Sequence, residues 1–200
     1  KKLVEELAAT SDVVMENFAT GVLERLGLGY SHLRTIKPDL VMISGSTMGV
    51  TGPDRNSTGW GPNVCAYAGQ PFLTGYQGGS PQNLGGNWPD YLVGTIMAFS
   101  ILSSLWHRNK TGRGQYIEVA MAETISSMIP EGFLEYSMTG QQVERIGNHD
   151  PNMAPHNVYA CKGDDAWVAL AVQSDEEWRS LCQIMGHPEL SDDGKFAALE

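Results

Sequence analysis

Two short apolar segments, separated by helical sequence, constrain the fold of this chain most strongly. Residues 12–15 (DVVM) and 40–44 (LVMIS) are each typical of a β-strand that is buried on both faces of a parallel sheet. Between them, residues 21–28 and 31–36 have helical patterns, and Lys37-Pro38 ends the second. The order strand, helix, helix, strand predicts right-handed crossovers and therefore a parallel α/β sheet.

The later patterns predict one more strand, a hairpin and several helices. They place a long apolar helix at 91–108, a strand at 115–120, a helix at 122–136 with a kink at Pro130, a β-hairpin at 158–172, and a helix at 174–185 that begins with a Ser174/Glu177 capping box. The apolar stretch 91–106 is short for a membrane span and contains Gly, Thr and Ser. We therefore expect it to be a buried helix.

Charge and cysteine content exclude several classes of protein. Lys and Arg number 13 against 23 Asp and Glu, a formal net charge of −10, whereas nucleic acids and anionic membranes attract clustered positive charge. The three cysteines are scattered and odd in number, which argues against a disulfide framework or a zinc cluster. The sequence therefore predicts a cytoplasmic protein that binds neither nucleic acid nor membrane.

Residues 45–90 differ in composition from the rest of the chain. They follow the end of a predicted strand and hold 11 of the 23 glycines and five prolines, Pro53, Pro62, Pro71, Pro81 and Pro89, which predicts a long loop. Ligands of open α/β proteins bind at the carboxyl ends of the strands, and long loops inside a compact domain are usually functional. We expect five aromatic side chains of this segment to be buried: Trp60, Tyr67, Phe72, Tyr76 and Trp88.

Asp90 is the strongest candidate for a catalytic residue. It stands where this glycine-rich segment enters the long apolar helix, so its carboxylate would accept backbone N–H bonds and meet the positive end of the helix dipole. An ionised carboxylate can attack an acyl carbon. The alternative is that Asp90 is simply the N-cap of the helix. Arg25 could clamp a phosphate or lie on a helix surface, and His149 and His156 could bind a metal or lie in a solvated loop.

Eight motifs, together with Asp90 and Gly94, resemble the family III CoA-transferases, also called the CaiB/BaiF family, across essentially the whole chain. The motifs are VMENF at 14–18, GVLERLGLGY at 21–30, ISG at 43–45, TGP at 51–53, LWHR at 105–108, TGRGQYIEVAM at 111–121, RIGN at 145–148 and PHNVY at 155–159. That family includes formyl-CoA and carnitine CoA-transferases and the related α-methylacyl-CoA racemases. The combination of motifs carries the resemblance, because each motif alone would be weak.

The resemblance implies a fold and an assembly. It implies that residues 1–128 belong to a Rossmann-like, CoA-binding large domain, 129–147 to a linker, and 148–200 to the beginning of a small α+β domain. The full-length protein would be a homodimer of interlaced chains. Because helical patterns run to both ends of the sequence, we expect this chain to be an internal fragment of a longer one.

The resemblance also implies site residues and a reaction. Asp90 matches the catalytic aspartate of the family, and four residues match positions that contact CoA: Asn17, Phe18, Arg25 and Leu26. The implied reaction moves CoA from an acyl-CoA to a carboxylic acid through an aspartyl anhydride and an aspartyl-CoA thioester. It uses the CoA thioester as substrate and needs no metal or other cofactor.

Three departures from the family bear on specificity. Formyl-CoA transferase has Lys and Glu where this chain has Thr58 and Gly61, and a glycine-rich loop near residues 149–152. The racemases have a His-Asp pair where this chain has Trp60-Gly61, so the second proton-transfer group of a racemase is missing. A transferase is favoured, with a racemase or epimerase and a non-catalytic CoA-binding subunit as alternatives. The sequence does not identify the acyl group or the acceptor acid.

Overall fold

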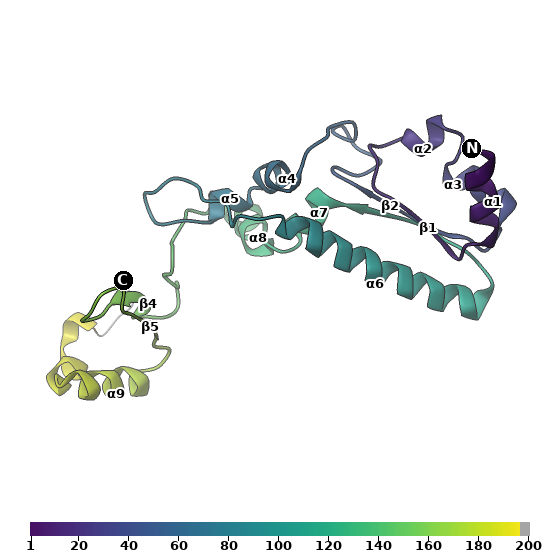
Figure 1. Cartoon of the computed structure of the whole chain (residues 1–200). Helices are drawn as coiled ribbons and strands as arrows, with labels where there is room; N and C mark the ends of the chain where they lie inside the picture. Colours follow the sequence, from purple (N-terminus) through teal and green to yellow (C-terminus); the bar gives the residue numbers. More distant parts are fainter. Residues whose placement is uncertain (197–200) are drawn as a thin grey trace. The chain divides into compact units, whose positions relative to one another are not determined.

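The computed structural model describes residues 1–196, in two compact units (Figure 1). The first unit consists of residues 1–74 and 81–143, and the second consists of residues 75–80 and those from 144 onward. The domain limits predicted at 128 and 148 stay a prediction, although the predicted linker does contain a regular helix, α8 (Pro130–Thr139).

A parallel sheet forms the centre of the first unit. Its strands are β1 (Val13–Glu16), β2 (Val41–Ser46) and β3 (Tyr116–Ala120), in the spatial order β1-β2-β3. In register, Val14 pairs with Met42 and Ile43 pairs with Ile117. The predicted parallel α/β sheet is therefore confirmed. The central strand is the most apolar, and its first three residues are completely buried.

Successive side chains of β2 point to opposite faces of the sheet and anchor two hydrophobic clusters. Met42 packs with residues of α1 (Lys2–Thr10), α2 (Val22–Arg25) and α3 (Tyr30–Ile36). Ile43 packs on the other face against Val93 and Met97 of the long helix α6 (Trp88–Thr111). Figure 1 shows these helices on the two faces of the sheet. Because side chains of a strand alternate between the two faces of the sheet, β2 packs against helices on both faces.

Helix α6 buries only one of its faces, so the prediction of a buried helix is wrong in part. Val93 and Met97 are buried against the sheet, but four large apolar residues on the rest of the helix are each at least 68% exposed: Tyr91, Phe99, Leu102 and Trp106. The reason is that α6 meets the sheet along a single stripe, and no other described element of the first unit covers its outer face. Within residues 1–196, no helix has both the length and the hydropathy of a membrane span.

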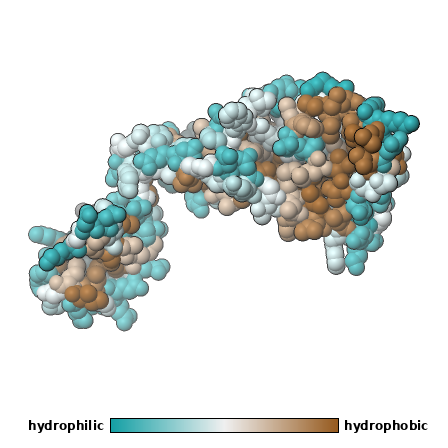
Figure 2. Space-filling view, viewed as in Figure 1, coloured by the Kyte–Doolittle hydropathy of each residue, from teal (hydrophilic) through white to brown (hydrophobic). Residues whose placement is uncertain are grey.

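Further exposed apolar side chains lie on α1 and on the edge strand β1. They include Leu3 and Leu7 of α1 and Met15 of β1. Figure 2 shows hydrophobic residues gathered over this end of the first unit. Met15 pairs in register with Ile43, so both side chains lie on the face of the sheet that packs against α6. Met15 is nevertheless exposed, because it belongs to the edge strand β1.

The glycine-rich segment contains two helices that the sequence analysis missed. These are α4 (Gly61–Ala68) and α5 (Gln70–Leu73), and Gly69 separates them with a positive φ of 84°. Three of the five aromatic residues expected to be buried are exposed instead: Trp60, Tyr67 and Tyr76. Glycine and proline content predicted a loop, but both prolines of these helices stand in a first turn, where a missing N–H costs nothing.

Pro130 starts a helix and does not kink one. The predicted helix at 122–136 is two helices, α7 (Met121–Ser126) and α8, with Pro130 as the first residue of α8. Pro at this position has a φ suited to the helix and no N–H that needs a partner. Helix α7 packs beside α4, where Val64, Cys65 and Ile125 form a third hydrophobic cluster with their neighbours.

The second unit contains the predicted hairpin and helix. Strands β4 (His156–Ala160) and β5 (Trp167–Ala171) pair antiparallel. Helix α9 (Asp175–Met185) is followed by two 3₁₀ turns, η1 (Pro188–Asp192) and η2 (Gly194–Phe196). Ser174 is the N-cap of α9, as predicted, and its Oγ accepts from the Glu177 N–H at 3.3 Å. The Glu177 carboxylate accepts from the Gln173 N–H instead of that of Ser174, so the capping box is only half formed.

Candidate active site

Asp90 lies in the first turn of α6, as its third residue. The helix begins at Trp88, and the Asp90 N–H donates to the main-chain carbonyl of Asn87 at 3.0 Å. Asn87 therefore holds the N-cap position, and the alternative in which Asp90 is the N-cap is wrong. The sequence placed the helix start three residues too late because Pro89 resembled a breaker, whereas Pro is favoured in a first turn.

The Asp90 side chain is exposed and free of hydrogen bonds and ion pairs within residues 1–196. The expected backbone N–H bonds to its carboxylate are absent there. Its nearest wall is the start of α4. A Cβ atom built on Gly61 would stand 3.2 Å from the Asp90 Oδ2 atom. The carboxylate thus lies close to Gly61, and both of its oxygens are without a hydrogen-bond partner within residues 1–196.

Two helices, α4 and α6, begin beside this carboxylate. The N-terminal end of an α-helix carries a partial positive charge from its unpaired N–H groups. The same charge would stabilise an oxyanion formed close to Asp90. The arrangement therefore combines a free carboxylate with an environment that favours negative charge in a transition state.

Cys65 is the other nucleophilic side chain near Asp90, one turn along α4 from Gly61. It is completely buried. Burial raises the pKa of the Cys65 thiol, and the nearby Asp90 carboxylate raises it further. The thiol therefore stays protonated at neutral pH, and the thiolate, which is the reactive form, is suppressed. Asp90 is left as the accessible nucleophile.

A small polar pocket lies at the carboxyl ends of β1 and β2. Its volume is about 160 Å³, and it is lined by Ala19, Thr20, Arg25, Ser46, Thr47, Arg55, Asn56, Ser57 and Thr58. The lining contains two guanidinium groups, five hydroxyl groups and no carboxylate. The Ser46 Oγ atom is buried there, with no hydrogen-bond partner among the described residues. These donors suit a phosphate, which arginine binds with paired hydrogen bonds.

The loop between β2 and α4 carries half of this pocket and is tied down at several points. The Val50 N–H donates to the carboxylate of Glu118, and the Thr20 hydroxyl donates to the Gly49 carbonyl at 3.0 Å. Near the other end of the loop, the Tyr67 hydroxyl donates to the Asp54 carboxylate at 2.8 Å, and this hydrogen bond raises the pKa of Tyr67. The pocket wall is therefore held in place by the segment between β1 and α2, by β3 and by α4.

This pocket and Asp90 lie a short distance apart. Thr58 lines the pocket, Gly61 lies beside the Asp90 side chain, and three residue steps separate Thr58 from Gly61. Three extended residues span at most ~10 Å. A ligand with a phosphate end and a reactive end can thus reach from the pocket to the carboxylate.

Of the residues predicted to contact CoA, the structure brings only Arg25 into the pocket. Asn17 and Phe18 follow β1, and Leu26 follows α2; Phe18 and Leu26 are exposed, and none of these three lines the pocket. Sequence reasoning missed Arg55 and Ser46. The signal for Ser46 was present, since it is the last residue of a parallel strand.

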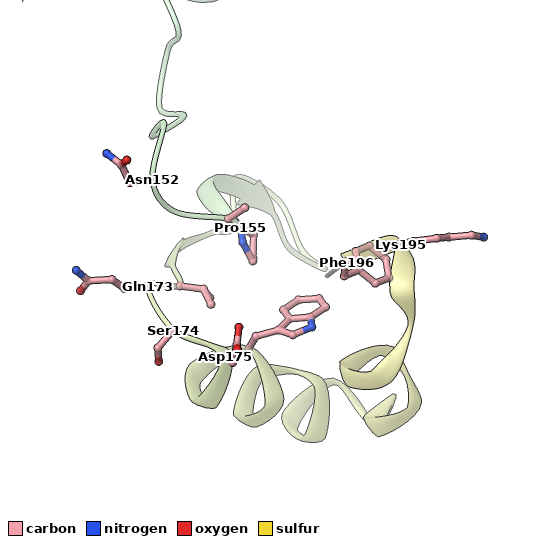
Figure 3. A pocket seen from close by; sticks show the side chains of 10 residues that line it. Asn152, Pro155, Gln173, Ser174, Asp175, Lys195 and Phe196 are labelled. Carbon is pink, nitrogen blue, oxygen red and sulfur yellow. The ribbon is translucent and has the colours of Figure 1, made fainter. Parts of the chain in front are cut away.

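The second unit has a cavity of about 390 Å³ with a mixed polar and apolar lining, in which Lys195 is the one cationic side chain among the described lining residues. Figure 3 shows Asn152, Gln173 and Lys195 extending away from this cavity. His149 and His156, considered above as metal ligands, each have a hydrogen-bond partner within the protein: His156 Nδ1 contacts the Asn148 carbonyl at 2.6 Å, and His149 Nε2 contacts the Asn157 amide. In the described part of the chain, no three His, Cys, Asp or Glu side chains gather as metal ligands would.

The fold thus places a polar pocket with two arginines at the strand ends of a parallel α/β sheet, and a free carboxylate at a nearby helix start. The family model for "CoA-transferase family III" matches residues 1–200. The chain belongs to this family.

Relatives and solved structures are similar to this chain over almost all of its length. It is 36% identical over 195 residues to a succinyl-CoA–D-citramalate CoA-transferase of Chloroflexus aurantiacus, covering 98% of this chain and 48% of the relative. It is 34% identical to an acetyl-CoA:oxalate CoA-transferase of Acetobacter aceti, covering 96% of this chain and 49% of that relative. A CaiB/BaiF family protein from Brucella suis has a similar structure, with a TM-score of 0.85 and 32% identity, covering 99% of this chain and 52% of that one. The chain therefore spans about half the length of the proteins it matches.

Proposed function

We propose that the whole protein transfers CoA from an acyl-CoA donor to a carboxylic acid acceptor, with Asp90 as the nucleophile. One observation carries this proposal: the Asp90 carboxylate is exposed and unpaired among the described residues, and it lies within a short span of a two-arginine pocket. Family membership and the names of the relatives support the same reaction class.

The first half of the reaction releases the donor acid. An Asp90 carboxylate oxygen attacks the thioester carbonyl, the C–S bond breaks, and CoA leaves as a thiolate, which gives a mixed anhydride. The thiolate then attacks the side-chain carbonyl carbon of Asp90, and the donor acid leaves as a carboxylate. The product is an aspartyl-CoA thioester. Covalent catalysis divides one difficult exchange into two easier ones.

The second half repeats these steps with the acceptor. Its carboxylate attacks the aspartyl thioester and expels the CoA thiolate, which forms a second anhydride. The thiolate attacks the acceptor's acyl carbon, giving the new acyl-CoA and a free Asp90 carboxylate. Each step exchanges one acyl bond for another, so the cycle needs no water, metal or redox group.

The polar pocket would hold a phosphate group of CoA. Arg25 and Arg55 supply positive charge, and the hydroxyl groups around them supply donors. The pantetheine arm of CoA separates its phosphates from its sulfur and would run from this pocket toward Asp90. Asn17, Phe18 and Leu26 remain proposed CoA contacts, on the surface that follows β1 and α2.

A racemase is the less favoured alternative. It would need a second group that exchanges a proton at the α-carbon. The segment beside the Asp90 carboxylate is Trp60-Gly61-Pro62, which contains no titratable side chain, and Trp60 is 83% exposed. The nearby Cys65 thiol is completely buried and its pKa is raised, so no exposed titratable group of this segment faces Asp90, which supports transfer over racemisation.

We further propose that the whole protein is a homodimer. The exposed apolar face of α6, formed by residues such as Phe99, Leu102 and Trp106, supports this, because soluble proteins rarely leave such stripes uncovered. Size-exclusion chromatography of the full-length protein with light scattering tests it. A mass of two chains is expected, and a compact monomer would contradict the assembly.

Covalent capture tests the reaction itself. The full-length protein is mixed with succinyl-, acetyl- and glutaryl-CoA in turn, quenched, and examined by peptide mass spectrometry. We expect an adduct on the peptide that contains Asp90 with at least one donor, and none in Asp90→Asn. A stable adduct on another residue, with Asp90 unmodified, would refute the assigned nucleophile.

A further inference from the structure

We propose that the indole of Trp60 forms part of the surface that receives the acyl group, and that the protein acts on CoA thioesters of apolar monocarboxylic acids, above all those with an aromatic ring. The inference rests on the proposed function, in which Asp90 attacks the thioester. It deepens that proposal by naming the class of acid that is transferred.

Trp60 lies close to the reacting carboxylate because its neighbour in the chain, Gly61, stands beside it. Trp60 is the N-cap residue of α4, and its N–H donates to Asn63 Oδ1 at 3.3 Å. A Cβ atom built on Gly61 would stand 3.2 Å from Asp90 Oδ2. Since consecutive Cα atoms are ~3.8 Å apart, the Trp60 Cα atom lies at most ~9 Å from that oxygen. A tryptophan side chain is long enough to reach a group that is bonded to Asp90.

The indole of Trp60 is available to such a group. Trp60 is 83% exposed, and its ring has no aromatic or cation–π partner among residues 1–196. The attacked carbonyl must come within ~3–3.5 Å of Asp90, which brings the attached acyl chain beside residues 60 and 61. Covering the indole with an apolar acyl group is favourable, and a flat aromatic ring adds a stacking contribution.

The pantetheine arm of CoA suits this surface less well than an apolar acyl group does. Its two amide groups need hydrogen-bond partners, which the faces of an indole ring do not supply. The arm is also common to every CoA thioester. A contact with the arm would therefore affect all donors equally, whereas a contact with the acyl group would depend on the donor.

A second carboxylate on the acyl group would find no cation beside Trp60 in the described part of the first unit. Residues 57–63 have no charged side chain, and Arg25 and Arg55 line the polar pocket, where they would face a phosphate. The other Lys and Arg residues of this unit belong to α1, to α3 and the residue after it, or to the C-terminal end of α6 and the turn that follows. Burial of an unpaired carboxylate is costly, so a monocarboxylic acid is favoured.

Steady-state kinetics of the full-length protein test the acyl preference. We expect kcat/KM for phenylacetyl-CoA to exceed that for succinyl-CoA by at least ~10-fold. Trp60→Ala should lower kcat/KM for phenylacetyl-CoA by ~10-fold and that for acetyl-CoA by less than about twofold. Trp60→Phe should keep most of the activity with phenylacetyl-CoA, because it retains an aromatic face. Met138→Ala is the matched control, since Met138 is equally exposed, at 83%, in the last turn of α8.

Two kinetic results would overturn the inference. A higher kcat/KM with succinyl-CoA than with phenylacetyl-CoA would refute the monocarboxylic class. An equal loss with phenylacetyl-CoA and acetyl-CoA in Trp60→Ala would place the indole against the CoA arm instead of the acyl group.

Binding of CoA thioethers tests the same contact without turnover, because a thioether has no carbonyl for Asp90 to attack. By calorimetry, the full-length protein should bind S-benzyl-CoA ~10-fold more tightly than S-methyl-CoA, and this ratio should fall below about threefold in Trp60→Ala. Equal affinities for the two thioethers in the unaltered protein would contradict the inference. The binding preference can hold even if no CoA transfer is found, and transfer can occur without it, so the two proposals fail separately.

Discussion

The guanidinium of Arg108, in the last turn of α6, donates to the Asp12 carboxylate at 2.9 Å and to the Asp12 carbonyl at 3.3 Å. Asp39, which precedes β2, also lies 4.0 Å from this guanidinium. Arg108 thus joins the end of the long helix to the starts of two parallel strands. This junction is at the opposite end of the sheet from the polar pocket with Arg25 and Arg55, which lies at the carboxyl ends of the strands.

Loss of this junction should lower stability without altering substrate binding. Arg108→Met keeps much of the apolar stem and removes the hydrogen bonds. We expect the free energy of unfolding, measured with urea, to fall by about 1 kcal/mol, because Asp12 is largely exposed and the pair is partly screened. The KM for acyl-CoA should not change. A rise in KM with unaltered stability would contradict this structural role.

Arg25 should act on the phosphate end of the substrate. In Arg25→Ala, the KM for acyl-CoA should rise ~10-fold or more with a smaller change in kcat, since a charged hydrogen bond contributes ~1.5–3 kcal/mol. The KM for the corresponding acyl-pantetheine, which has no phosphate, should be unaffected. Arg34→Ala is the control, because Arg34 lies over the Tyr30 ring on α3 and does not line the pocket. An equal rise in the KM for acyl-CoA and the KM for acyl-pantetheine would rule out a contact between Arg25 and a phosphate.

Gly114 should tolerate no side chain. A Cβ atom there would overlap the main chain of Asp39 and Leu40, just before the central strand. We expect Gly114→Ala to lose at least ~2 kcal/mol of stability or to fail to accumulate as folded protein. Gly94→Ala is the comparison, since nothing lies within 4 Å of its Cβ position and helix propensity favours alanine by up to ~1 kcal/mol. Similar melting curves for the two variants would contradict the packing described.

Proton exchange separates transfer from racemisation. With no second titratable group beside Asp90 at Trp60-Gly61, the full-length protein should catalyse no deuterium uptake at the α-carbon of a 2-methylacyl-CoA in heavy water. Proton NMR or mass spectrometry of the recovered thioester measures this. Uptake that disappears in Asp90→Asn would favour the racemase alternative.

The sequence predicted the parallel sheet and the hairpin because each strand is visible as a local pattern. The run 40–44 is buried by helices on both faces, and such burial leaves a continuous apolar segment. Helix starts were predicted less well. Pro62, Pro89 and Pro130 were each treated as loop or kink signals, yet all three stand in the first turn of a helix.

The candidate site was predictable only in part. The residues around Asp90 were enough to predict that it lies at a helix start, and the family resemblance indicated its role. The contact between Asp90 and Gly61 could not be predicted, because it depends on how α4 packs against α6 across 29 residues of sequence. The pairing of Arg25 with Arg55 depends in the same way on the loop that Glu118 and Tyr67 hold.

The most direct measurement of the central claim is the turnover of full-length Asp90→Asn. Asparagine keeps the size and shape of the side chain in the first turn of α6, but an amide cannot form the anhydride. We expect the variant to retain its Tm and its affinity for acyl-CoA, while CoA transfer falls by at least ~10³-fold, as loss of a nucleophile typically causes. Asp90→Ala should be equally inactive. A folded Asp90→Asn protein with near-normal CoA transfer would contradict the account.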